Sequence, residues 1–468
     1  MIIKGKNMKM KKFVFGFLIL TLLSCNYVTQ MIVPPTATPL PTATATATTS
    51  PTPTSVALLP AYIPPECEAA PLATVPPDVI AQATLEVQAN SEISKSKQMR
   101  VLRDLGNVVE ATYVYPDFNG KDWNEIESRY RSKIEAGLKT EMFYTEMQNM
   151  ISELGDEHSF FLSPLEVEAS EAELKGDVDF VGIGVYGNFD VQHGHISVIS
   201  ILSNSSAEYA GIKAHDTILM ADGLPVFDGN TNRLRGPDCS AVSVSVQSPG
   251  EEPRDLILLR HTIHGGINIE ARLVPTTDGS KIGYIFIPTF FDETIPSQIE
   301  DALNEFGPLD GLVLDVRMNG GGSSTVANPV LSFFTSGNLG KFVGRDSSRT
   351  MDVEADPIQN SQTVPLVVMV SKDTVSYGEI FAGILRDSRD AKITGETSLG
   401  NVELLHGFDF DDGSQVWLAS ERFFPAHSDE NWEETGIIPD IQAFADWDTF
   451  TFETDPSIAA AVTLLGHE

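Results

Sequence analysis

Apolar residues recur at spacings of three and four between about residues 92 and 163, which places them along one face of a helix. After a polar turn, the pattern predicts two further helices, from about 122 to 135 and from 140 to 154. Gly155 is a natural helix end, so His158 is expected on a loop just past the last helix. The first helical face is formed by Met99, Leu102, Leu105, Val108 and Val109.

The pattern changes between about residues 176 and 270, where short apolar runs are separated by turn-forming residues. Such runs predict an all-β segment with one short helical stretch. Glycines in the run 180–185 allow another backbone to approach closely. The other elements of this segment are expected at 195–201, 206–212 and 216–223.

This β segment closely resembles a PDZ domain of the bacterial protease kind, because of its glycine-containing loop, its short helix and the strand that ends at Asp222-Gly223. PDZ domains capture an extended peptide tail by adding it as a strand to a sheet edge, and their backbone amides receive the tail's carboxylate. The resemblance implies peptide binding by Gly182, Ile183 and Gly184. The alternative is a β module that only packs against its neighbours.

From residue 281 onward strands alternate with helices, which is typical of an α/β layer structure. A strand is predicted at 283–287, a helix at 295–306 and a buried strand at 311–317. The last strand leads into Gly320, Gly321 and Gly322, whose backbone N–H groups can point into a cavity, as an oxyanion hole requires. A phosphate loop would need a following Lys-Ser/Thr pair, which this loop lacks, and a plain loop is the other interpretation.

Ser376 lies on a polar turn between a buried strand at 365–370 and a helical pattern from Glu379 to Arg386. A serine on a strand-to-helix turn is well placed to act as a nucleophile, because its hydroxyl stands clear of the sheet and N–H groups at the helix start can face an oxyanion. From this turn alone, a helix-capping role for Ser376 is the simpler interpretation.

The chain of 468 residues has a formal net charge of −34 and a pI of about 4.5. Such a chain should repel nucleic acid, so no nucleic-acid partner is expected. The nine histidines form no recognisable metal-binding motif, and neither a metal nor another cofactor is expected.

The first 24 residues read as a signal peptide, with five lysines followed by a short apolar core. The sequence Leu22-Leu23-Ser24-Cys25 resembles a bacterial lipoprotein box, which implies lipidation of Cys25, a membrane anchor and an extracytoplasmic location at the cell surface or in the periplasm. A Pro/Thr-rich linker follows, which should hold the folded part off the membrane. Cys67 and Cys239 remain and could form one disulfide in an oxidising compartment.

Residues 92–445 together resemble the C-terminal processing (tail-specific) peptidase family, in a match that covers about three quarters of the chain. Each motif alone is weak, but their order is specific. The resemblance implies an α+β multidomain protein with an N-terminal helical segment, a PDZ β-domain and an α/β peptidase core of the crotonase/ClpP type. The motifs are Asp315–Gly322, Thr374–Ile380, Gly395–Gly400 and Gly436–Asp440.

The predicted organisation divides the chain into five parts. These are the signal peptide at 1–24, the lipidated cysteine and Pro/Thr-rich linker at 25–90, the helical domain at 91–175, the PDZ domain at 176–275 and the α/β peptidase core at 276–468.

The commonest members of this family pair the serine with a lysine, but Asn401 occupies that position and cannot accept a proton. Lys372 and Lys392 lie outside the motif position. Two other features resemble the tricorn-like branch, which uses a histidine before the PDZ domain and a glutamate near the end of the core. His158 and Glu433 match these two residues.

The resemblance implies acyl transfer, with His158 as the general base for Ser376. Backbone N–H groups of the Gly320–Gly322 loop and of Tyr377 would hold the oxyanion, while Glu433 would orient the assembly or recognise substrate. A solvated surface carboxylate is the other interpretation of Glu433. Ser159 is either a helper or a turn residue. The alternative bases are His406 and His427, which we rank below His158.

Two functions remain open from the sequence. The first is an extracytoplasmic serine endopeptidase that cleaves protein or peptide substrates bound as extended tails. The second is an inactive pseudo-protease that binds peptide through its PDZ domain and cleft. Asn401 favours the second, whereas the retention of Ser376, His158, Glu433 and the glycine loop favours the first.

Overall fold

The computed structural model describes residues 60, 62–68, 90–156, 158–168, 180–190, 193–228, 231–264 and 266–467. The predicted signal peptide, Cys25 and most of the predicted linker lie outside these residues. Among the helices in the described ranges, none is both long and apolar enough to cross a membrane.

A six-stranded sheet forms the centre of the C-terminal half, in the order β12-β13-β14-β17-β18-β21. All strand pairs are parallel except β12 with β13. Every residue of β13, β14 and β17 is buried, as expected for parallel strands covered on both faces. The strands are β12 (Glu270–Val274), β13 (Ile282–Phe286), β14 (Gly311–Asp315), β17 (Leu366–Val370), β18 (Lys392–Gly395) and β21 (Ile441–Gln442).

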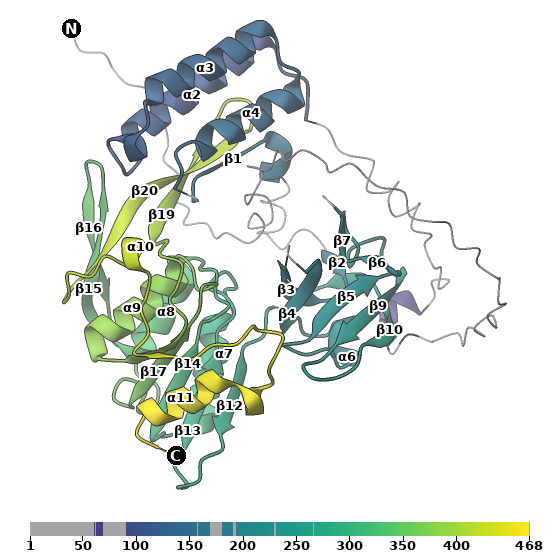
Figure 1. Ribbon diagram of the computed structural model, residues 1–468, viewed down its shortest axis with the longest axis vertical. Helices are drawn as coiled ribbons and strands as arrows, with labels where there is room; N and C mark the ends of the chain where they lie inside the picture. The colour runs from purple at the N-terminus through teal and green to yellow at the C-terminus, as the bar shows by residue number, and fades with distance from the viewer. Residues whose placement is uncertain are drawn as a thin grey trace, which may run out of the picture.

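Helices cover both faces of this sheet (Figure 1). Leu312 and Leu314 of β14 pack with the helices α7, α8 and α9, whereas Val313 between them packs with α11 on the opposite face. The helix predicted at 295–306 is confirmed with the same bounds. The helices are α7 (Ile295–Phe306), α8 (Ser324–Phe334), α9 (Tyr377–Arg389) and α11 (Pro456–Leu464).

A second, antiparallel sheet joins the N-terminal helices to the core. Its long strand β20 pairs with β1 and β15 along one edge and with β19 along the other. The far end of β20 packs into the helices through Val416 and Leu418 (Figure 1). The elements are α2 (Lys95–Thr112), α3 (Trp123–Ala136), α4 (Thr140–Ser152), β1 (Phe160–Leu162), β15 (Gly337–Gly344), β16 (Ser348–Val353), β19 (Glu403–Asp409) and β20 (Gln415–Pro425).

The predicted β segment forms a separate antiparallel sheet in the order β10-β9-β5-β4-β3. Strand β3 is an edge strand, and its Phe189 lies 5.0 Å, centroid to centroid, from Phe227 of the short hairpin β7–β8. The elements are β2 (Phe180–Gly182), β3 (Val185–Asp190), β4 (His195–Ile201), α6 (Ser206–Tyr209), β5 (Thr217–Ala221), β6 (Leu224–Pro225), β7 (Phe227–Asp228), β8 (Thr231–Asn232), β9 (Ala241–Gln247), β10 (Arg254–Leu259) and β11 (His261–Ile263).

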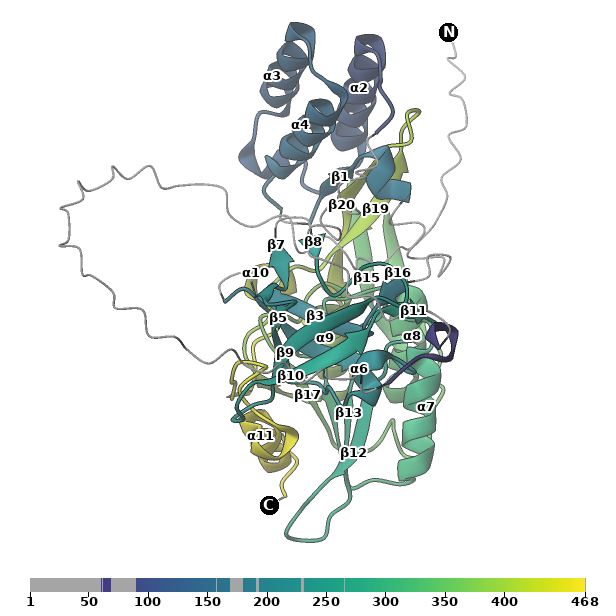
Figure 2. The ribbon, with the colours of Figure 1, turned by 90° about the vertical axis from the view of Figure 1, so that its right-hand side faces the viewer.

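The C-terminal segment of the core fastens this β domain to the central sheet. Trp447 donates from Nε1 to the carbonyl of Val198, and its own carbonyl lies 2.7 Å from His215 Nδ1. Burial lowers the pKa of His215. These contacts of the C-terminal segment join the β domain to the core. Figure 2 shows the β domain in front of the core.

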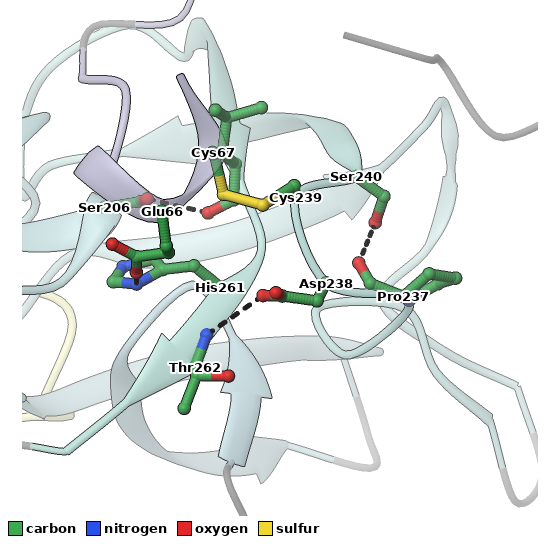
Figure 3. Close-up of a disulfide and its surroundings, with 10 residues drawn as sticks. Glu66, Cys67, Ser206, Pro237, Asp238, Cys239, Ser240, His261 and Thr262 are labelled. Atoms are coloured by element: carbon green, nitrogen blue, oxygen red, sulfur yellow. Dashed lines mark hydrogen bonds and ion pairs between the residues drawn. A yellow bond between two sulfur atoms is a disulfide. The ribbon is translucent and has the colours of Figure 1, made fainter. Parts of the chain in front are cut away.

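A disulfide joins Cys67 to Cys239, which confirms the pairing that the cysteine count allowed (Figure 3). Cys67 ends the short helix η1 (Pro65–Cys67). Near it, Glu66 Oε1 lies 3.0 Å from His261 Nδ1, and the Tyr62 ring stacks on Tyr209 at 3.8 Å between centroids. The segment 62–68 is thus pinned to the β domain.

Candidate active site

Ser376 occupies a strained turn between β17 and α9. Its φ of 56° and ψ of −123° lie in a region that non-glycine residues rarely adopt. The N–H of Ser376 donates to the carbonyl of Asn401 at 3.0 Å and to Glu379 Oε2 at 3.2 Å. A half-buried serine held in this conformation has the geometry of a nucleophile turn, as the sequence predicted.

Glu379 fixes this turn against the loop that contains Asn401. Its side chain is fully buried and accepts from the N–H groups of Gly400 and Asn401 at 2.7 and 2.9 Å and from Ser398 Oγ at 2.6 Å. Burial raises the pKa of Glu379, and these hydrogen bonds offset part of that increase. The position of Ser376 therefore depends on a buried carboxylate three residues further along the chain.

The glycine loop lies against the serine. Gly321 has a φ of 100°, and a Cβ on it would stand 2.9 Å from Ser376 Cβ and 3.2 Å from both Ser376 Oγ and the Tyr377 nitrogen. Gly321 donates its own N–H to Asn319 Oδ1 at 2.9 Å. Tyr377 begins α9, so its N–H has no acceptor within the helix. The loop predicted to form the oxyanion hole therefore lies against the Ser376 turn and the start of α9.

His158 lies in a tight polar loop after α4, and only 7% of it is exposed. Asp156 Oδ1 accepts from the N–H groups of His158 and Ser159 at 3.1 and 2.8 Å. The hydroxyl of Ser159 donates to Asp156 Oδ2 and accepts from the N–H of Ala419 in β20. Ser159 therefore acts as a turn residue that ties the histidine loop to the second sheet.

Glu403 is the carboxylate partner of His158, and the sequence analysis missed it. Its Oε2 lies 3.3 Å from His158 Nδ1, while Oε1 accepts from the hydroxyl of Tyr115 at 2.6 Å. Glu403 starts β19, which pairs with β20, and His158 directly precedes β1, which also pairs with β20. No local motif marks Glu403, because only the pairing of the strands brings it to the histidine.

Glu433 completes the group from α10 (Trp432–Thr435). Its Oε2 accepts from the N–H of Val402 at 2.7 Å. Burial, followed by the neighbouring Glu403, raises the pKa of Glu433 to about 9. Burial also acts to raise the pKa of Glu403, but contacts with His158, Glu433 and Tyr115 outweigh it and lower that pKa. At neutral pH the pair therefore holds one proton, on Glu433, and the surface interpretation of Glu433 is wrong.

Ser376 and His158 both contact the segment 401–403, and no hydrogen bond joins them to each other in the described part of the chain. Asn401, whose carbonyl accepts from the N–H of Ser376, is two residues from Glu403. Two residues of chain span at most about 7 Å. The other candidate bases make different contacts: His406 Nε2 lies 3.3 Å from Glu421, and exposed His427 donates its backbone N–H to Asp387. His158 is the histidine that contacts Glu403.

Asn401 is buried where the commonest relatives have a lysine. It is 6% exposed, and its Oδ1 has no hydrogen-bond donor among the described residues. Lys392 at the start of β18 pairs with Asp390 at 2.9 Å, and Lys372 is exposed. Neither lysine is placed as a substitute base for the one that is missing.

Within the part of the chain that the structure describes, two groups of side chains bring potential metal-binding atoms together, both at the β domain. In the first, Asp190, His193 and His195 have potential ligand atoms within 4.8 Å of one another. The second consists of Asp238 with Cys67 and Cys239, whose sulfurs are already bonded to each other. Neither group includes a residue of the Ser376 turn.

Comparisons with known proteins agree with this geometry. The model of "Peptidase family S41" matches residues 281–443, and that of the "Tricorn protease C1 domain" matches residues 97–154, which end just before the histidine loop. The photosystem II D1 C-terminal processing protease has the same fold, with a TM-score of 0.54, 26% identity and coverage of 79% of this chain and 98% of that chain.

Relatives similar in sequence are also named as C-terminal processing proteases. A chloroplastic C-terminal processing peptidase of Tetradesmus obliquus is 30% identical over 355 residues, which are 71% of this chain and 75% of the relative. A carboxyl-terminal-processing protease of Synechocystis is 26% identical over 391 residues, 80% and 88% of the two chains. The fold and the serine turn define a serine-type peptidase. The chain belongs to the C-terminal processing peptidases of family S41.

Proposed function

We propose that this peptidase cleaves protein or peptide substrates through an acyl-enzyme on Ser376, with His158 as the general base. The observation that carries the proposal is the buried contact between His158 and Glu403. A carboxylate at Nδ1 holds an imidazole in the tautomer whose Nε2 can accept a proton, and it stabilises the imidazolium that forms. Asn401 cannot take that role, because an amide does not accept a proton at neutral pH.

In the proposed reaction, His158 Nε2 takes the hydroxyl proton of Ser376 as Oγ attacks the peptide carbonyl. The imidazolium then protonates the leaving amine, and water repeats the two steps to release the acid. The serine and histidine close to hydrogen-bond distance when substrate binds, since catalytic hydrogen bonds often tighten only in the complex. Glu403 positions the histidine, and the protonated Glu433 holds Glu403.

The oxyanion is held by the N–H of Tyr377 and an N–H of the Gly320–Gly322 loop. Within the described residues, Gly320 and Gly322 donate to no protein acceptor, whereas Gly321 donates to Asn319. Gly321 itself packs against Ser376 and leaves the room that the oxyanion needs. Donors fixed before the reaction are the main source of such stabilisation.

The β domain is proposed to be a PDZ domain that captures an extended tail along its free edge strand β3. The loop Gly182-Ile183-Gly184 precedes this strand, and its two carbonyls at 183 and 184 are already bonded to Ala207 and Leu202. Its N–H groups remain the candidates for a carboxylate. The proposal extends to an extracytoplasmic location and lipidation of Cys25, which rest on the N-terminal sequence alone.

The second candidate is a pseudo-protease that binds peptide without cutting it. It is favoured by Asn401 in the usual lysine position and by the open Ser376–His158 pair. The two candidates differ in one measurement, the labelling of the chain from Glu92 onward by a serine-reactive fluorophosphonate together with casein hydrolysis. We expect labelling and hydrolysis in the wild type, and loss of both in Ser376→Ala and His158→Ala, while Asn401→Lys keeps both.

The opposite result would be an inert wild-type protein that Asn401→Lys activates. It would identify a lapsed Ser-Lys enzyme and would remove His158 from the mechanism. An inert wild type that stays inert with lysine would leave the peptide-binding function.

A further inference from the structure

A cavity of about 340 Å³ opens beside the nucleophile turn. One wall is the loop 399–401, whose carbonyl at Asn401 accepts the N–H of Ser376 at 3.0 Å. The opposite wall comes from the histidine loop and from α10. A volume of this size fits one long side chain, and the cavity shares the loop 399–401 with the Ser376 turn.

The cavity is lined mainly by hydrogen-bond acceptors. Four carboxyl groups reach it, against one guanidinium. With one proton on the Glu403–Glu433 pair, the formal charge is three negative and one positive, or about −2. The groups are Asp156, Glu403, Glu433, Glu434 and Arg422.

A buried acceptor without a donor distinguishes this cavity from a solvated acidic surface. Asn401 lines it with 6% of the residue exposed, and its Oδ1 has no donor among the described residues. Glu403 Oε2, by contrast, is already contacted by His158 Nδ1 at 3.3 Å, which leaves the amide oxygen of Asn401 as the free acceptor. Buried acceptors of this kind cost free energy until a donor reaches them.

The guanidinium of Arg422 does not balance this excess of hydrogen-bond acceptors and negative charge. It donates from Nη2 to Asn431 Oδ1 at 3.0 Å and lies over the rings of Tyr115 and Phe424, at 5.5 and 5.3 Å from their centroids. Its Nε is a buried donor without an acceptor among the described residues, but it is one donor against the Asn401 Oδ1 atom and four carboxyl groups. The cavity therefore favours a ligand that donates hydrogen bonds and carries positive charge.

We propose that this cavity is a specificity pocket for the cationic side chain of a lysine or arginine next to the cleaved bond. The shorter Asn401 leaves the space that a lysine side chain would fill at the same position, and the substrate supplies the cation instead. The inference rests on the proposed function of Ser376, because it assumes that the bond cut lies beside this turn.

The test compares fluorogenic peptides that differ at one position next to the cleaved bond, carrying lysine, arginine, norleucine or glutamate, with EDTA present throughout. Norleucine matches the lysine stem without its charge. We expect kcat/KM for lysine and arginine to exceed that for norleucine by about 10- to 100-fold, the range for hydrogen bonds to a charged group. Glutamate should be the poorest substrate.

Two variants assign the preference to the cavity. Asn401→Lys places a cation in the pocket and should remove the lysine preference. Asn401→Leu fills the space without charge and should lower kcat/KM for every long side chain. Glu434→Gln should lower the lysine-to-norleucine ratio. Asp429→Asn changes the same charge on an exposed residue outside the cavity lining and is the matched control, with an unchanged ratio.

The two proposals fail in different ways. If the wild type reacts with the fluorophosphonate and cuts peptides but prefers norleucine or glutamate, the pocket assignment is wrong and the peptidase stands. If it neither reacts nor cuts, fluorescence anisotropy with Ser376→Ala still measures peptide binding. Equal affinity of this variant for the lysine and norleucine peptides would contradict the assignment of the cavity as a pocket for a cationic side chain. A preference for glutamate, or loss of binding on amidation of the peptide terminus, would point to Arg422 as a carboxylate site instead.

Discussion

The residues of this site are held in states that they would not adopt in a free chain. Ser376 takes a positive φ, Glu433 retains a proton, and His158 is almost fully enclosed. Each state is imposed by the surroundings: Glu379 fixes the serine, burial and then Glu403 raise the pKa of the Glu433 carboxyl, and Asp156 and Glu403 hold the histidine. Such strained or perturbed groups cluster at functional sites, where the surrounding fold compensates for their cost.

Replacement of Glu403 by alanine should lower kcat by about 10²- to 10⁴-fold with a small change in KM, because the imidazole loses the carboxylate that orients it. Steady-state kinetics measures both constants. Asp429→Asn is the control, and an unchanged kcat in Glu403→Ala would separate Glu403 from the reaction.

Glu433→Gln tests the protonation state of the carboxyl pair. The folded-state pKa of Glu433 is raised to about 9, above the ordinary value near 4.5, so the bound proton stabilises the fold and this stabilisation decreases as pH rises between these values. Glutamine keeps a neutral donor and does not titrate. We therefore expect the stability of the glutamine variant, relative to wild type, to increase from pH 5 to pH 9.

Chemical denaturation at three pH values measures this difference for Glu433→Gln. At neutral pH the variant should keep most of its activity, whereas Glu433→Ala should not. Stability curves that run parallel in wild type and Glu433→Gln would show that Glu433 is ionised throughout.

At the scale of elements, the site forms where strand ends and helix starts meet. The start of α9 follows β17 directly, the glycine loop follows β14, and these two strands are parallel neighbours, so both turns emerge at the same edge of the sheet. The second sheet brings the remaining groups, since β20 pairs with both β1 and β19. Ser376, the proposed nucleophile, therefore belongs to one sheet, and His158, its proposed base, to another.

Gly321→Ala should disturb the contact between the glycine loop and the nucleophile turn. An added Cβ would meet Ser376 at 2.9 Å on a backbone with a φ of 100°, so we expect a loss of about 1–3 kcal/mol in the free energy of unfolding and no fluorophosphonate labelling. Gly320→Ala is the matched stability control, because a Cβ there meets nothing within 4 Å. Equal stability of the two variants in urea unfolding would contradict the described packing.

At the scale of the whole molecule, contacts between distant parts of the chain hold three modules together. The N-terminal helices share a sheet with the core, the C-terminal segment at Trp447 fastens the β domain, and the disulfide ties segment 62–68 to that domain. His158 comes from the module that precedes the β domain, so the proposed active site requires the helical part and the core to be correctly joined.

The double variant Cys67→Ser/Cys239→Ser should lower the stability of the β domain. The disulfide closes a loop with a sequence separation of 172 residues, and loss of such a cross-link typically costs about 2–5 kcal/mol. Thermal unfolding with and without reductant measures the change, and reduced wild-type protein should behave like the variant. Unchanged unfolding of both samples would show that the packing of Tyr62 and Glu66 suffices.

The amino-acid sequence by itself determined the elements and the nucleophile. Helix α7, strand β4 and the serine turn could be predicted because the spacing of apolar residues, the apolar runs and the positions of glycines are local features of the sequence. The ordered motifs also identified the family and singled out His158 and Glu433. Predicted helix ends differ by a few residues, as at α9, which starts at Tyr377 rather than Glu379, because the strained turn itself begins the helix.

Only the tertiary structure decided what those residues contact. Glu403 lies 245 positions from His158 in the chain, and strand pairing through β20 rather than any motif places it at 3.3 Å. The same folding puts Glu433 against a second carboxylate, so that it keeps its proton, and leaves Asn401 facing an acidic cavity. Desolvation and charge proximity are properties of the packed site, and a linear pattern of residues does not contain them.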